Sequence, residues 1–236
     1  MQKKNKGRIY LVPTPLIEGE INTIPEMNRL IVASCRYFLV ESFKTGRRHI
    51  RAMVPAFDLD SAVLEQLDKS TPVEDLENLI EPVFQGHDIC VLSDAGCPGI
   101  ADPGSRLVQL AHHKNIEIIP LSGPSSITLA LMASGYNGQQ FTFHGYLSRN
   151  KSELKIELRK IEQMANYATQ IFMETPYRNL SLFNQLTAFL SPNVQLCIAC
   201  DLTSANSLVK SQTISQWKKQ TAPNIHKRPC IFLITK

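Results

Sequence analysis

Short apolar runs alternate with amphipathic segments through the first half of the chain, and this alternation restricts the fold more than any other feature. Runs of this length predict strands, and apolar residues recurring at helical spacing predict helices between them. Strand, helix, strand alternation is typical of βα units and a mostly parallel sheet. The predicted strands cover 8–12, 37–40, 88–92 and 116–121, and the predicted helices cover 24–33, 73–84 and 105–113.

The second half of the chain has a different order of elements. Strands are predicted at 141–147, 170–173, 194–202, 208–214 and 229–234, with helices at 127–134, 151–165 and 178–190. The last three strands follow one another without a predicted helix, which favours antiparallel pairing. We therefore expect an α/β protein with two α/β domains, residues 1–121 with a mostly parallel sheet and residues 122–236 with a mixed sheet.

Composition is that of an ordinary globular protein, with 236 residues, 43% hydrophobic and 19% charged. The basic start is followed by only Ile9-Tyr10-Leu11-Val12 before Pro13, which is too short for the apolar core of a signal peptide. No apolar stretch approaches the length needed to span a bilayer. We expect a chain that is not exported, has no membrane partner and acts in the cytoplasm.

Six scattered cysteines lie mostly in apolar runs and are expected to be reduced core residues. Cys197 and Cys200 form a C-x-x-C pattern, but they lie in a predicted strand, where residues three apart point to opposite faces. That geometry disfavours a shared metal or a disulfide, so no metal site is predicted.

The net charge of +4 is mildly basic and is compatible with an anionic partner such as RNA. If the segment around Arg47, Arg48 and Arg51 is helical, Arg47 and Arg51 share a face while Arg48 lies about 100° away. A phosphate-binding face and an ordinary solvated surface are both compatible with this pattern.

Three turn-rich segments each follow a predicted strand: 13–15, 93–104 and 122–126. In an open α/β sheet, ligands bind outside the carboxyl ends of the strands, so three such loops favour one shared ligand cleft. Asp94 would face this cleft, and Ser125 or Ser126 can cap the helix that follows. No G-x-G-x-x-G motif occurs, and Ser105 stands where a phosphate-binding loop needs lysine, which excludes an NTPase.

Together these loops resemble a known family. The stretches Y-L-V-P-T-P, L-S-D-A-G-C-P with D-P-G, and P-L-S-G-P-S are similar to the tetrapyrrole-methylase superfamily of S-adenosylmethionine-dependent methyltransferases. F-H-G-Y-L, E-T-P-Y-R and D-L-T agree with the branch that methylates the ribose 2′-hydroxyl of cytidine in small-subunit ribosomal RNA. The resemblance covers nearly the whole chain, which we expect to be the short form without the C-terminal extension of longer members.

The resemblance implies two α/β domains with S-adenosylmethionine between them, usually in a homodimer, and ribosomal RNA or the small ribosomal subunit as partner. It places the cofactor against residues from the three loops and one later strand, namely Pro13, Thr14, Pro15, Asp94, Ala95, Gly96, Pro98, Gly99, Ile100, Ser125, Ser126 and Met173. It places the acceptor near Lys44, Arg47, Arg178 and Thr203.

Several segments depart from the branch pattern, mainly on the acceptor side. Leu16-Ile17-Glu18-Gly19 replaces Ile-Gly-Asn-Leu, and Glu41-Ser42-Phe43-Lys44 replaces Glu-Asp-Thr-Arg. An amine cannot hold a phosphate through two parallel hydrogen bonds as a guanidinium does. The acceptor therefore stays open between RNA and a small molecule or tetrapyrrole, and a non-catalytic cofactor-binding protein is a third alternative.

A ribose acceptor would benefit from a general base, which typically accelerates such a step by about 10²–10⁴-fold. The carboxylates that could serve are Glu41, Glu174 and Asp201, and the sequence does not rank them.

Overall fold

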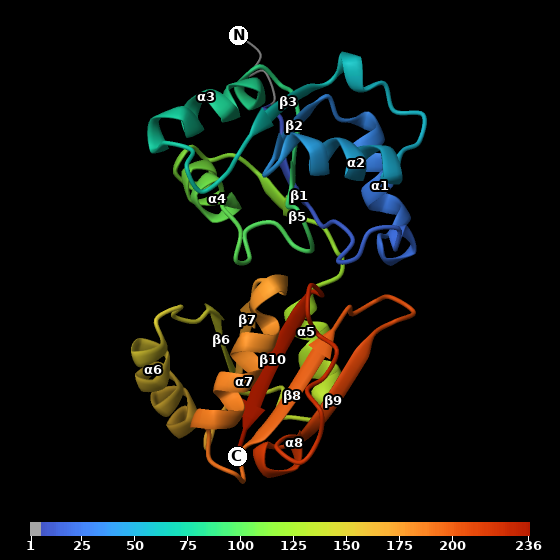
Figure 1. Ribbon diagram of the computed structural model, residues 1–236. Helices are drawn as coiled ribbons and strands as arrows, with labels where there is room; N and C mark the ends of the chain where they lie inside the picture. The colour runs from blue at the N-terminus through green and yellow to red at the C-terminus, as the bar shows by residue number, and fades with distance from the viewer. Residues whose placement is uncertain (1–5) are drawn as a thin grey trace. The chain divides into compact units, whose positions relative to one another are not determined.

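The computed structural model describes residues 6–236, so part of the basic N-terminus lies outside the described residues. The chain divides into two compact units, one ending at Ser125 and one running from Ser126 to Lys236 (Figure 1). Within the described part of the chain, no helix is long and apolar enough to cross a membrane.

The first unit is built on a five-stranded parallel sheet with the order β3-β2-β4-β1-β5. Because all strands are parallel, their carboxyl ends meet at one edge of the sheet. The strands are β1 (Ile9–Val12), β2 (Tyr37–Val40), β3 (Val63–Gln66), β4 (Ile89–Leu92) and β5 (Ile118–Pro120).

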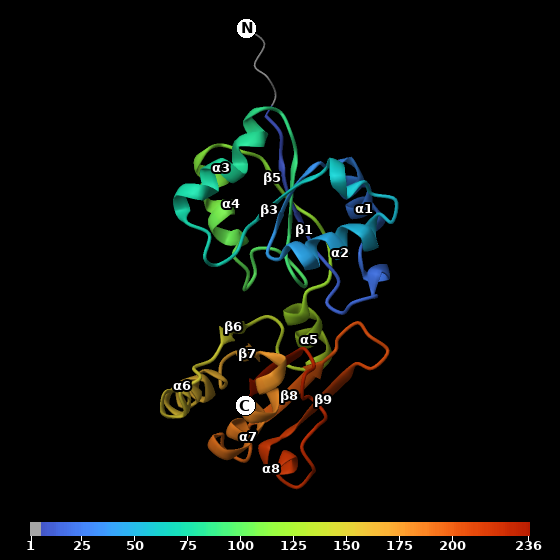
Figure 2. The same cartoon turned by 45° about the horizontal axis from the view of Figure 1, so that its top comes forward.

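Helices cover both faces of this sheet (Figure 2). They are α1 (Glu26–Ser34), α2 (Phe43–Met53), α3 (Val73–Phe84) and α4 (Gly104–His113), with short 3₁₀ turns η1 (Ile21–Thr23) and η2 (Leu59–Ser61). The central strand β4 shows why both faces are apolar: Ile89 and Val91 pack under α3 and α4, whereas Cys90 and Leu92 pack under α1 and α2. A strand buried on both faces is a continuous apolar run.

The second unit contains a mixed sheet with the order β6-β7-β10-β8-β9, in which only β6 and β7 are parallel. Its strands are β6 (Phe141–Tyr146), β7 (Thr169–Glu174), β8 (Gln195–Cys200), β9 (Leu208–Thr213) and β10 (Cys230–Thr235). The antiparallel pairing predicted for the last strands is confirmed.

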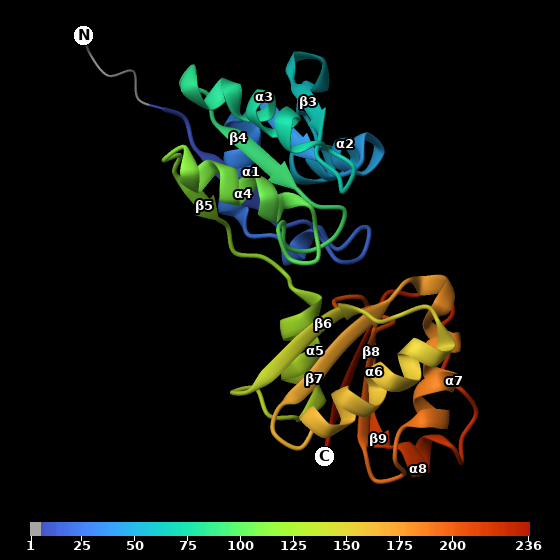
Figure 3. The ribbon, with the colours of Figure 1, turned by 90° about the vertical axis from the view of Figure 1, so that its left-hand side faces the viewer.

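One helix covers one face of the second sheet, and three cover the other. Helix α5 (Ser126–Ser134) packs across β8, β9 and β10, on the face opposite α6 and α7 (Figure 3). The other face is covered by α6 (Lys151–Met164), α7 (Asn179–Phe189) and the short α8 (Ile214–Trp217), with the 3₁₀ turn η3 (Pro176–Arg178) before α7.

The predicted α/β class is confirmed, with a parallel first sheet and a mixed second sheet. Every predicted strand and helix is present with small shifts at its ends, but α2 and β3 were not predicted as elements. Helix α8 also interrupts the last three strands, where none was expected. It begins at Ile214 because the Thr213 hydroxyl accepts from the Gln216 backbone amide and the Gln216 side chain accepts from the Thr213 backbone amide, forming a capping box.

The C-x-x-C pair behaves as predicted within strand β8. Cys197 packs in the cluster under α5, whereas Cys200 packs in the cluster on the opposite face. Cys200 instead lies opposite Cys230 of β10. All six cysteines are free thiols.

Candidate active site

Loops from three strands meet at the carboxyl edge of the first sheet. Thr14, after β1, forms an isolated antiparallel bridge with Gly96, after β4. The Thr14 amide donates to the Gly96 carbonyl at 2.9 Å, and the Gly96 amide donates back to Thr14 at 3.1 Å. The Thr14 hydroxyl also donates to the carbonyl of Ser93 at 3.2 Å. Since Thr14 is fully buried, the first two loops are joined by satisfied internal hydrogen bonds.

The third loop, after β5, packs directly on the other two. The Cys97 thiol lies 3.5 Å from the carbonyl oxygen of Pro124. A Cβ atom on Gly123 would lie only 2.2 Å from the Cβ atom of Pro13. The backbone approach therefore requires glycine at this position. The predicted convergence of these three loops is present within the first unit.

The long loop between β4 and α4 is organised around Asp102. Its Oδ1 atom accepts from the backbone amides of Gly99 at 3.1 Å and Gly104 at 2.9 Å. Gly99 has a φ of 81°, and Ala101 also takes a left-handed conformation, with a φ of 58°. The Asp102 carboxylate thus stabilises a tight bend of the backbone. Ile100 lies within this bend and is 51% exposed.

His49 is a site residue that the sequence analysis missed. It lies on the buried face of α2 with Gly46, Ile50 and Met53, at the i, i+3, i+4, i+7 spacing that could have revealed it. Its Nε2 atom lies 3.0 Å from the carbonyl oxygen of Asp94. Burial lowers the pKa of His49, so the neutral ring with a proton on Nε2 donates to this carbonyl.

Glu41 follows β2 at the same edge of the sheet. Burial raises the pKa of its carboxyl above the ordinary value, and the negative charges of Asp102 and Asp94 raise it further. The backbone of Asp94 and the positive charge of Lys69 offset part of this rise in pKa. A raised pKa makes the Glu41 carboxylate a stronger base than an ordinary glutamate.

The residues that the resemblance assigns to the cofactor differ in accessibility. In the first unit, Pro13, Thr14, Pro15, Gly96 and Pro98 are buried, whereas Asp94, Ala95 and Ile100 are exposed and Gly99 and Ser125 are half-buried. The buried residues support the conformation of the loops, and a ligand can reach the accessible residues.

The remaining assigned residues are spread over both units. Ser126 begins α5, and Met173 lies half-buried in β7. Lys44 and Arg47 are exposed on α2 of the first unit.

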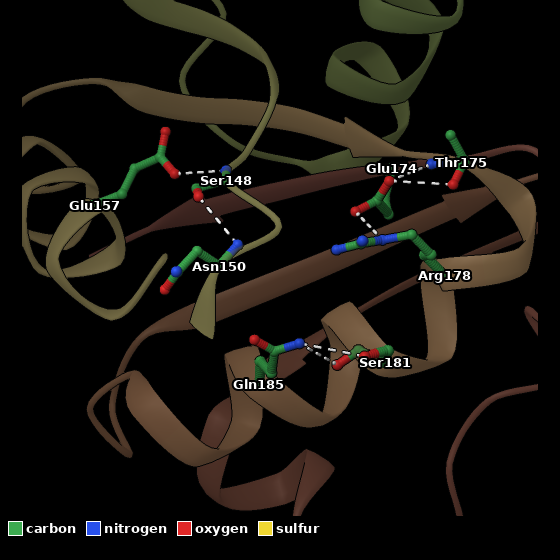
Figure 4. Close-up of polar contacts among 8 residues, drawn as sticks. All are labelled: Ser148, Asn150, Glu157, Glu174, Thr175, Arg178, Ser181 and Gln185. Carbon is green, nitrogen blue, oxygen red and sulfur yellow. Dashed lines mark hydrogen bonds and ion pairs between the residues drawn. The ribbon is translucent and has the colours of Figure 1, made fainter. Parts of the chain in front are cut away.

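Glu174 and Arg178 form a polar cluster at the end of β7 (Figure 4). The Glu174 side chain, 5% exposed, accepts from the Arg178 Nε atom at 2.9 Å. It also accepts from the amide of Thr175 at 2.7 Å and from its hydroxyl at 3.2 Å. Glu174 is thus committed to holding the turn that leads into α7.

Asp201 lies after β8 in a left-handed conformation, with a φ of 47°. Its Oδ2 atom accepts from the Nε atom of Arg228 at 2.7 Å. Thr203 follows with a φ of 77°, and its buried hydroxyl has no hydrogen-bond partner among the described residues. Glu174 and Asp201 each form an ion pair with an arginine, whereas burial and neighbouring acids raise the pKa of Glu41.

Comparisons with known proteins agree with this architecture. The family profile of the Tetrapyrrole (Corrin/Porphyrin) Methylases matches residues 35–217. The chain is 26% identical to the Ribosomal RNA small subunit methyltransferase I of Vibrio cholerae, over 88% of this chain and 69% of that protein. It is 31% identical to the protein of the same name from Synechocystis sp., over 84% of this chain and 67% of that protein.

A solved structure shows the same fold. The crystal structure of the methyltransferase CobJ matches with a TM-score of 0.66 at 15% identity, over 98% of this chain and 94% of that chain.

Proposed function

Because the chain belongs to the tetrapyrrole (corrin/porphyrin) methylase family and is a methyltransferase, we propose that it methylates a ribose 2′-hydroxyl in small-subunit ribosomal RNA, with S-adenosylmethionine as donor. RNA is proposed as the acceptor because the chain is similar to proteins named Ribosomal RNA small subunit methyltransferase I over most of their length. The CobJ likeness supports the fold alone, because the identity is only 15%.

The loops of the first unit suit a cationic donor. S-adenosylmethionine carries a positively charged sulfur, and Asp94 and Glu41 bring carboxylates to the edge where the three loops meet. The accessible backbone around Ala95 and Gly99 offers amide and carbonyl groups for the neutral parts of the molecule. Ser125, Ser126 and Met173 are proposed as further contacts on the grounds of the resemblance.

When bound, S-adenosylmethionine supplies an activated methyl group, so the protein mainly has to position the acceptor and receive its proton. The acceptor oxygen forms a bond to the methyl carbon as the carbon–sulfur bond breaks, and the sulfur keeps that electron pair. We assign the released proton to Glu41, because burial and two neighbouring acids raise its basicity.

Three cations, exposed Lys44 and Arg47 and half-buried Arg178, are proposed to contact the RNA backbone. Lys44 and Arg47 project from α2, and Arg178 lies at the start of α7. Contacts of this kind position an RNA without reading its sequence. We propose that the protein acts as a homodimer in the cytoplasm, where such a substrate is found.

The test uses the methyl-labelled donor and small ribosomal subunits that lack the modification. A 2′-O-methyl group removes the hydroxyl that attacks the neighbouring phosphodiester in alkali. Ribose methylation therefore leaves the label in alkali-resistant dinucleotides, whereas base methylation leaves it in mononucleotides. We expect label in dinucleotides, with Glu41→Gln as the inactive control.

Other outcomes separate the alternatives. Label in mononucleotides would contradict the ribose acceptor but retain RNA as substrate. Label in an added tetrapyrrole and none in RNA would replace the proposal with small-molecule methylation. Donor binding measured by calorimetry, with no transfer to either acceptor, would identify a cofactor-binding protein without catalysis.

A further inference from the structure

A hollow in the second unit lies beside the turn that follows β7. It has a volume of about 580 Å³. Its lining contains one lysine, Lys151, together with Tyr177, His226 and the side-chain amides of Asn184 and Gln185, and no carboxylate. Tyr177 is 71% exposed, a large aromatic surface left in water. A hollow that carries a lysine, an exposed ring and no carboxylate suits an anionic aromatic ligand.

The chain holds Tyr177 in a firm frame. The backbone amide of Lys227 donates to the carbonyl of Pro176 at 2.9 Å, joining the loop before β10 to the turn that carries Tyr177. The fully buried Asn179 donates from its Nδ2 atom to the carbonyl of Arg228 at 2.6 Å. One bond joins two backbone groups, and the other is made by a buried side chain. Together they fix the backbone of the turn that carries the exposed Tyr177 ring.

Two groups of the same loop surround the ring. The Nζ atom of Lys227 lies 5.5 Å from the Tyr177 ring centroid. The His226 ring meets Tyr177 edge-on, with centroids 6.2 Å apart and an interplanar angle of 85°. Lys227 has a φ of 62°, a left-handed conformation that residues with a Cβ atom rarely adopt. The fold therefore holds a cation beside this ring at a conformational cost.

Arg178 adds a cation that is anchored at only one atom. Its Nε atom is bound to the buried carboxylate of Glu174, and its two terminal nitrogens have no partner among residues 6–236. In the view of Figure 4 the guanidinium extends from the start of α7 toward the loop of Ser148 and Asn150. At that loop, Glu157 accepts from the Ser148 amide at 2.9 Å and Glu153 accepts from the Ser148 hydroxyl at 2.7 Å, so both carboxylates are bound to Ser148.

We propose that this surface is a single-stranded RNA subsite in which Tyr177 stacks on one base of the substrate and Arg178 and Lys227 contact the adjoining phosphates. This inference rests on the proposed function, which it deepens by naming the surface that holds RNA outside the reacting nucleotide. Bases stack on exposed aromatic rings in proteins that bind single-stranded nucleic acid, and a basic surface follows the backbone.

The test measures RNA affinity separately from methyl transfer. Filter binding uses a naked transcript of the small-subunit ribosomal RNA and, in a second series, the assembled small subunit. The variants are Tyr177→Ala, Tyr177→Phe and the matched control Tyr167→Ala. Tyr167 is 79% exposed and lies just before β7, whereas Tyr177 lies after the same strand. Tyr167→Ala therefore removes a similarly exposed tyrosine from the opposite end of β7.

We expect Tyr177→Ala to weaken binding of the transcript by about 5- to 150-fold, the loss expected for one stacked base. Tyr177→Phe keeps the ring and should bind like the wild type, as should Tyr167→Ala. Lys227→Gln should reduce the slope of log affinity against log salt by about one phosphate contact. Affinity for S-adenosylmethionine should be the same in all four variants.

Equal losses for Tyr177→Ala and Tyr167→Ala, or no loss for either, would overturn the subsite. A loss of affinity for the assembled subunit with none for the transcript would also overturn it, because the contact would then require a feature that only the assembled subunit has. Failure of the proposed function has a different signature: the wild type would transfer no methyl group to RNA even where it binds the transcript.

Discussion

The Nε2 atom of His49 lies 3.0 Å from the carbonyl oxygen of Asp94, so a buried helix residue holds the first turn of the longest loop at the site. His49 is 5% exposed, and nothing in the local sequence around Asp94 indicates this contact. The bond connects the packing of α2 with the position of the loop that carries Asp94, Ala95 and Gly96.

Replacement of His49 by alanine should weaken S-adenosylmethionine binding by roughly tenfold, the effect of losing a buried hydrogen bond of about 1–2 kcal/mol. His49→Gln can place an amide nitrogen near the position of Nε2 and should recover most of the affinity. Calorimetric titration of the donor checks both variants. Equal weakening in the two would show that the ring acts through its volume and not through the hydrogen bond.

His49 also predicts an acid dependence of stability. Burial lowers its pKa below the ordinary 6.5, so as the pH falls below that value the unfolded chain takes up a proton that the folded chain does not. The free energy of unfolding should therefore decrease as the pH falls from about 6.5 and recover as it rises. Urea titrations across this range should show a shallower dependence for His49→Gln, and an identical slope would contradict the assignment.

Glu41→Gln should lower the rate of methyl transfer without lowering the stability of the fold. The variant should lower the rate of methyl transfer by about 10²–10⁴-fold, because it removes the proposed proton acceptor. Burial and two neighbouring acids raise the pKa of Glu41 above 4.5, so the charged carboxylate opposes folding as the pH rises above that value. Glu41→Gln should consequently be at least as stable as the wild type at neutral pH.

The wild-type rate should rise with pH as Glu41 loses its proton, and this limb should be absent in Glu41→Gln. Single-turnover rates measured with saturating donor check the profile. A variant that keeps the wild-type rate and profile would remove Glu41 from the mechanism.

Gly123→Ala tests the contact between the first and third loops. The new Cβ atom would lie 2.2 Å from Cβ and 2.7 Å from Cγ of Pro13, so the loops must separate. We expect a loss of stability of about 1–3 kcal/mol together with weaker donor binding. Gly138→Ala is the control, because its Cβ atom would meet nothing within 4 Å. Denaturant unfolding of both variants provides the comparison, and equal stabilities would refute the proposed steric conflict.

The ion pair between Asp201 and Arg228 is predicted to support the fold of the second unit. Arg228 also donates to the carbonyls of Asn206 at 2.7 Å and Asn224 at 2.5 Å. Arg228→Ala leaves these acceptors and the carboxylate without their cation, and should reduce stability by about 1–3 kcal/mol. Asp201→Asn tolerates the left-handed backbone and keeps an acceptor oxygen, so it should be milder.

Methyl-transfer assays on the folded Asp201→Asn variant distinguish this role from catalysis. We expect a rate close to that of the wild type. A strong loss of rate with unchanged stability would instead make Asp201 the proton acceptor in place of Glu41.

Most elements could be predicted because their patterns are local. The run Ile89–Leu92 is apolar throughout because both of its faces are buried, and α3 was predicted with its observed bounds. Helix α2 was not predicted because its buried face includes Gly46 and His49, and three arginines lie between its few apolar residues, so its apolar pattern is weak. The glycine is required by packing, since a Cβ atom there would lie 2.5 Å from a methyl group of Val40. Strand β3 was missed because it is a mostly exposed edge strand without an apolar run.

The sequence by itself determined the elements, the three turn-rich loops and the residues able to carry charge, because spacing and turn chemistry act over a few neighbouring positions. Only the tertiary structure decided which of them meet. Strand β1 lies between β4 and β5, so Thr14 contacts Gly96 and Gly123 contacts Pro13 although long segments separate them in the chain. The bond of His49 to Asp94 and the frame around Tyr177 have the same origin: sheet order and packing set these distances, and no local pattern encodes them.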